Sequence, residues 1–108
     1  MKIPGVKYQI HWATKHKQLV SVNQVLIKGT DFDECLKIIL YDKDLIKEVL
    51  NKIDKHNPSH IEFKFVDLHG PPIVFESNEF QNLIQQWMDA MISEEEYEIA
   101  AYIRDFKI

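Results

Sequence analysis

The chain has 108 residues, a formal net charge of −4 and 45% apolar residues, which exclude a disordered polymer and favour a single α+β domain spanning residues 1–108. The only cysteine, Cys35, excludes an internal disulfide and favours a reducing compartment. No apolar run has the length of a signal peptide or a membrane span, so we expect a soluble cytoplasmic protein without membrane contact.

The first half of the chain predicts a hairpin followed by helices. Every second residue is apolar at Val6, Tyr8, Ile10 and Trp12, and this period of two is typical of a half-buried strand. Residues 18–28 are apolar on both parities and predict a second strand. Thr30 followed by Asp33 resembles a capping box, after which apolar positions continue to about residue 55. We expect two helices there, or one bent helix, with Asp42 as the second cap.

The second half repeats this order of elements. Ile61, Phe63 and Phe65 alternate with polar residues and predict a strand, and residues 73–76 predict a short returning strand. Apolar residues then recur at intervals of three and four, which predicts an amphipathic helix from about residue 80. Ser93 with Glu96 predicts a capping box that opens a last helix, ending near residue 106.

These elements predict an α+β fold in the order ββα(α)ββαα. We expect a four-stranded, mainly antiparallel sheet with three to four helices on one face. Aligning Phe32 with Phe80 also leaves an internal pseudo-repeat open; if a pseudo-twofold axis relates the two halves, the two hairpins meet edge to edge. The residues expected to share one core are Tyr8, Ile10, Trp12, Phe63, Phe65, Leu83, Trp87 and Ile103.

No pattern in the sequence predicts a catalytic centre, a metal site or a cofactor. Neither G-x-S-x-G nor a Walker-type loop occurs, and the chain has only three glycines. His56 and His60 have the spacing of some zinc ligands, and His69 lies on a nearby loop, but Pro58 prevents the first two from sharing a helical face. The spacing of Cys35 predicts a core residue. An enzyme of unknown reaction therefore remains a second alternative only.

Charge indicates two binding hypotheses. Residues 1–30 hold five lysines and no acid, whereas residues 31–108 hold eight basic residues and all seventeen acids, a formal −9. The first hypothesis is a non-enzymatic protein-interaction module, such as an inhibitor, immunity protein, antitoxin or secretion chaperone. Its acidic helical surface would bind a basic protein. The candidate residues are Glu79, Asp89, Glu94, Glu95, Glu98 and Asp105.

The alternative hypothesis is nucleic-acid binding through the basic N-terminal hairpin. The candidate residues are Lys7, His11, Lys15 and Lys17, which would contact phosphates and bases. Against it, the aromatic residues of the first strand have the parity opposite to Lys7, and the sequence pI is near 5.7. An uncovered sheet edge would in addition allow a homodimer to form across a twofold axis.

Overall fold

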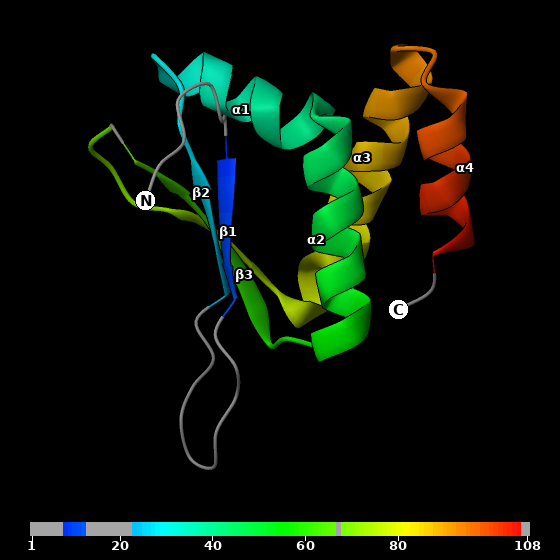
Figure 1. Ribbon diagram of the computed structural model, residues 1–108, viewed down its shortest axis with the longest axis horizontal. Coiled ribbons are helices and arrows are strands. Elements are labelled where there is room, and N and C mark those ends of the chain that lie inside the picture. Colours follow the sequence, from blue (N-terminus) through cyan, green and yellow to red (C-terminus); the bar gives the residue numbers. More distant parts are fainter. Residues whose placement is uncertain (1–7, 13–22, 67, 107–108) are drawn as a thin grey trace.

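The computed structural model describes residues 8–12, 23–66 and 68–106, and it confirms the α+β class (Figure 1). The order of elements along the chain agrees with the predicted order. The elements are β1 (Tyr8–Trp12), β2 (Asn23–Ile27), α1 (Phe32–Tyr41), α2 (Lys43–His56), β3 (His60–Phe65), β4 (Ile73–Glu76), the short 3₁₀ helix η1 (Ser77–Glu79), α3 (Phe80–Ser93) and α4 (Tyr97–Asp105).

The sheet is mixed, so the predicted four-stranded, mainly antiparallel sheet is wrong. Its body is formed by β1, β2 and β3: β1 pairs antiparallel with β2, but β2 pairs parallel with β3, residues 24–27 against 62–65. The short β4 is added antiparallel to residues 60–63 of β3. Parallel neighbours need a crossover connection, and α1 and α2 supply it. Alternation of apolar and polar residues does not encode strand direction, so the sequence pattern could not distinguish the two arrangements.

The pseudo-twofold arrangement of the two halves is also wrong. A twofold axis normal to the sheet reverses the direction of every strand, so it would make the central pair antiparallel. The observed parallel pairing of β2 with β3 is incompatible with such an axis. The two phenylalanines that suggested the repeat also lie in different environments, since Phe32 is 50% exposed and Phe80 only 2%.

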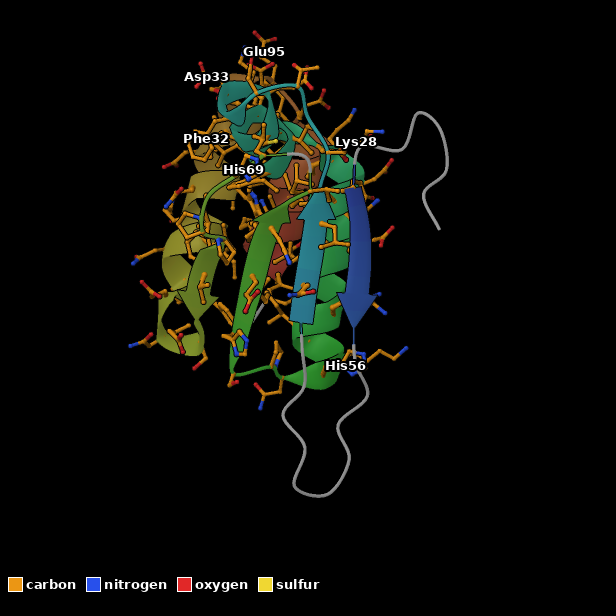
Figure 2. All side chains as sticks on the ribbon, turned by 90° about the vertical axis from the view of Figure 1, so that its left-hand side faces the viewer. Lys28, Phe32, Asp33, His56, His69 and Glu95 are labelled. Carbon is orange, nitrogen blue, oxygen red and sulfur yellow. The ribbon has the colours of Figure 1, made fainter. Side chains whose placement is uncertain are left out.

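The helices cover one face of the sheet, as Figure 2 shows with the opposite face toward the viewer. Val25 and Ile27 of β2, with Ile61 and Phe63 of β3, point into the layer between sheet and helices and are fully buried. Five predicted core residues are confirmed as buried: Phe63, Phe65, Leu83, Trp87 and Ile103. Tyr8 and Ile10 are partly buried against this core, and the side chain of Trp12 lies outside the described part of the chain.

Trp87 joins α3 to the buried end of α1. Its indole Nε1 donates a hydrogen bond of 2.8 Å to the carbonyl oxygen of Ile39. Ile39 lies in the last turn of α1, where carbonyls lose their partners within the helix. The neighbouring carbonyl of Ile38 accepts the N–H of Asp42 at 3.1 Å. The fully buried indole therefore fills the core and also satisfies a helix end that water does not reach.

Side-chain caps fix the starts of the two crossover helices. Asp42 caps α2 as predicted, because its Oδ1 accepts the N–H of Leu45 at 3.0 Å. The cap of α1 is Asp31 and not Thr30, since Asp31 Oδ1 accepts the N–H of Glu34 at 2.8 Å. The carboxylate of Glu34 reaches back to the N–H of Thr30 at 2.9 Å. The predicted pair Thr30 and Asp33 is therefore replaced by Asp31 and Glu34.

Candidate protein-binding surface

The structure divides the six predicted acidic residues between different parts of the antiparallel pair α3–α4 (Figure 1). Three of them gather where α3 turns into α4: Glu94, Glu95 and Glu98. The other three lie at the start of α3, within α3 and at the end of α4: Glu79, Asp89 and Asp105. A helix of 14 residues is about 21 Å long, so the six cannot form one compact site.

The turn between α3 and α4 exposes apolar as well as acidic side chains. We name it the α3–α4 corner and define it by Ile92, Glu94, Glu95, Glu96, Tyr97 and Glu98. Tyr97 is 62% exposed and Ile92 is 49% exposed. Exposed aromatic side chains surrounded by charged ones are typical of the anchors and rim of a protein interface. The corner therefore combines a candidate anchor with a negative field.

A groove of about 490 Å³ lies beside the corner, between the first turns of α2 and α4. Two contacts connect its walls. Lys43 Nζ lies 3.3 Å from Glu96 Oε1, and Lys47 Nζ lies 5.7 Å from the ring centroid of Tyr102. A half-exposed ion pair of this kind contributes little to stability, but the two contacts connect α2 to the N-cap of α4 and to Tyr102 further along the same helix. The side chains that line the groove are Lys43, Asp44, Lys47, Glu95, Glu96, Tyr97, Glu98 and Ile99.

Glu95 has a left-handed backbone conformation, which is unfavourable for any residue that carries a Cβ. The end of α3 is a Schellman turn, in which Glu96 N–H donates to the Met91 carbonyl at 2.8 Å and Glu95 N–H to the Ile92 carbonyl at 3.0 Å. This turn gives Glu95 a φ of 59°, a left-handed value that glycine adopts far more easily. The predicted capping box of Ser93 and Glu96 is accordingly wrong: Ser93 belongs to α3, and its hydroxyl donates to the Ala90 carbonyl.

The electrostatics of the corner differ between its two helices. Glu94 and Glu95 follow the carboxyl end of α3, where the helix dipole disfavours negative charge. Glu98 lies in the first turn of α4, where the same effect favours it. The dipole of α3 thus disfavours Glu94 and Glu95, whereas the dipole of α4 favours Glu98.

The residues of the nucleic-acid hypothesis are not tested. Lys7, Lys15 and Lys17 lie outside the described residues, and so does the side chain of His11. The described part of the open sheet face carries Gln24 and Glu62, joined by a hydrogen bond of 3.2 Å. Within β2, β3 and β4, that face presents no Phe, Tyr or Trp on which a base would stack.

The three histidines do not gather into one metal site among the described residues. His56 precedes the start of β3 and His69 follows its other end, so the two lie toward opposite ends of this strand (Figure 2). Within residues 8–12, 23–66 and 68–106, no group of three or more His, Cys, Asp or Glu could hold a metal ion. Cys35 is fully buried in the core, as predicted from its spacing.

A second groove, of about 530 Å³, lies between the end of β2, α1 and the start of α2. Near it, the hydroxyl of Tyr8 donates to Glu48 Oε1 at 3.4 Å. Burial raises the pKa of Tyr8, and the charges of Glu48, Asp42 and Asp44 raise it further. The phenol therefore stays protonated and cannot act as a base or nucleophile near neutral pH. Three lysines, three acids and Tyr41 surround the aliphatic side chain of Ile38 in this groove. The lining residues are Lys28, Glu34, Lys37, Ile38, Tyr41, Asp42, Lys43 and Asp44.

Comparison with known proteins supplies no relative: no family model, curated protein or solved structure matches the chain. Among the helices of the described residues, none combines the length and the apolar character needed to cross a membrane.

Proposed function

We propose that this protein is a non-enzymatic interaction module that binds a basic protein through the α3–α4 corner. An inhibitor, an immunity protein, an antitoxin and a secretion chaperone are the kinds of protein that work in this way. The cytoplasm is part of the proposal, because the single cysteine is buried in the core and the chain cannot form an internal disulfide.

The observation that carries the proposal is the conformation and charge of Glu95. A glycine at this position would relieve the left-handed backbone, and a lysine nearby would suit the end of α3. The chain instead has three consecutive glutamates, residues 94–96. Residues that break a local rule of stability without a structural gain are concentrated at functional sites. Binding of a cationic partner is a gain that would offset this cost.

The exposed side chains beside the glutamates support the same proposal. Negative charge at the rim accelerates the encounter with a positive partner, while most affinity comes from a few desolvated anchors. Tyr97 suits the anchor role, since its ring is rigid, more than half exposed and placed between Glu95 and Glu98 in the groove. An arginine or lysine of the partner would contact both the ring face and the carboxylates.

The experiment is affinity capture from native lysate, with nuclease treatment, comparing the wild type with two charge-reversed variants. The corner variant carries Glu94→Lys, Glu95→Lys and Glu98→Lys. The control variant carries Asp33→Lys, Asp54→Lys and Asp105→Lys, three exposed acids outside the corner, so its net charge changes by the same amount. Circular dichroism first establishes that both variants are folded.

The proposal expects a protein partner that survives nuclease, is retained by the control variant and is lost by the corner variant. Equal loss from both variants would mean that only net charge matters, and it would contradict a site at the corner. Capture of nucleic acid that the corner variant strengthens would instead support the alternative function of the basic N-terminal hairpin.

A further inference from the structure

The outer edge of β4 is the feature from which we draw a further inference, independent of the corner. β4 is the last strand in the order β1-β2-β3-β4, so no described strand pairs with its outer side. Such an edge offers a row of backbone groups to any extended chain, including a second copy of the same protein. Whether the edge is open depends on which N–H groups point outward and on what occupies them.

The ladder between β3 and β4 identifies the outward positions. Ser77 N–H donates to the Ser59 carbonyl at 2.8 Å, and hydrogen-bonded pairs alternate along an antiparallel ladder. With Phe75 opposite Ile61 and Val74 opposite Glu62, Phe75 directs its backbone groups toward β3. Val74 and Glu76 therefore direct their backbone N–H and C=O groups outward. Pro72, two residues before Val74, lies at the next outward position, just before the strand begins.

Two of these three positions offer no donor. Pro72 has no N–H. Glu76 N–H is already bonded to Glu79 Oε1 at 2.9 Å, as part of the reciprocal capping box that opens η1. Only Val74 keeps both an outward N–H and an outward carbonyl, so an added strand would find a single complete pair of backbone hydrogen bonds, which is too little to fix its register.

We propose that Pro72 and Glu79 close the β4 edge to strand addition. The chain then neither dimerises through β4 nor takes up an extended peptide there. This assigns Glu79 a role different from the predicted one: its carboxylate serves the strand edge and the start of η1, about one helix length from the α3–α4 corner. It also directs any partner to side-chain surfaces and away from this edge.

The test compares the double variant Pro72→Val, Glu79→Ala with the matched variant Pro72→Val, Glu79→Gln. Both restore an N–H at position 72, but glutamine keeps the side-chain oxygen that accepts Glu76 N–H. Light scattering over a concentration series measures the mass, and hydrogen exchange measures protection of the Val74 amide. We expect the alanine variant to rise from 12.8 kDa to twice that mass, with slower Val74 exchange, while the glutamine variant stays at 12.8 kDa.

A folded alanine variant that remains monomeric throughout the series would overturn the proposal. So would a glutamine variant that associates equally well, because the captured N–H would then be irrelevant. The wild type provides a test that needs no substitution: the Glu76 amide should exchange slowly and the Val74 amide rapidly. Protection of Val74 equal to that of Glu76 would show that the edge is already occupied.

Discussion

Replacing Glu95 by glycine should stabilise the protein while weakening its proposed interaction. The left-handed conformation of Glu95 costs a residue with a Cβ about 1–2 kcal/mol of stability, and glycine would remove this cost. Glycine also makes the unfolded chain more flexible, which offsets part of the stabilisation. We therefore expect a net increase of about 0.5–1 kcal/mol in the free energy of unfolding. For a chain of 108 residues, this corresponds to a melting temperature about 2–4 °C higher.

Thermal and urea denaturation of Glu95→Gly and Glu95→Ala separate the effect of the backbone conformation on stability from the effect of the charge. Both variants remove the carboxylate, but alanine keeps the Cβ, so only glycine should gain the full stabilisation. Asn57→Gly is the matched control, since Asn57 ends α2 with a φ of 47° and asparagine tolerates this region better than glutamate. The reasoning is refuted if Glu95→Gly is no more stable than Glu95→Ala, because the turn would then impose no strain.

Two further predictions concern the core. Trp87→Phe should lower the free energy of unfolding by about 1–3 kcal/mol, because it leaves the buried Ile39 carbonyl without its donor. Urea denaturation measures this change, and Trp87→Leu should cost at least as much. An unchanged free energy of unfolding in Trp87→Phe would contradict the role of the bond. Gly29→Ala should cost about 1–3 kcal/mol, because its Cβ would lie 2.8 Å from Cys35 Sγ. Cys35→Ala in the same chain should recover part of that loss, and strictly additive effects in the double-mutant cycle would argue against the clash.

Sequence periodicity predicted which residues of each helix and strand face the core. The stripe through Leu83 and Trp87 and the alternation through Phe63 both led to buried residues, because each pattern reports one face of one element. Sheet topology depends on pairing between distant segments, and neither strand pattern records its direction. The parallel contact of β2 with β3 therefore appeared only in the structure.

The positions of the candidate acidic residues could be predicted only in part. Sequence reasoning chose exposed acids on the last two helices, but it could not tell that Glu79 serves a capping box while Glu94, Glu95 and Glu98 share a turn. It also interpreted Ser93 and Glu96 as the start of a helix, because that spacing fits a capping box. The left-handed Glu95 has no signal in the sequence, since glycine or asparagine normally marks such a turn.

The rate at which the captured partner associates with the α3–α4 corner tests the proposed function most directly. The variant Glu94→Lys, Glu95→Lys, Glu98→Lys should associate at least about tenfold more slowly than the wild type at low salt, and the difference should shrink as salt screens the charges. The control variant with Asp33, Asp54 and Asp105 reversed should keep most of the wild-type rate. Equal rates for the two variants across the salt series would contradict an acidic binding surface at the corner.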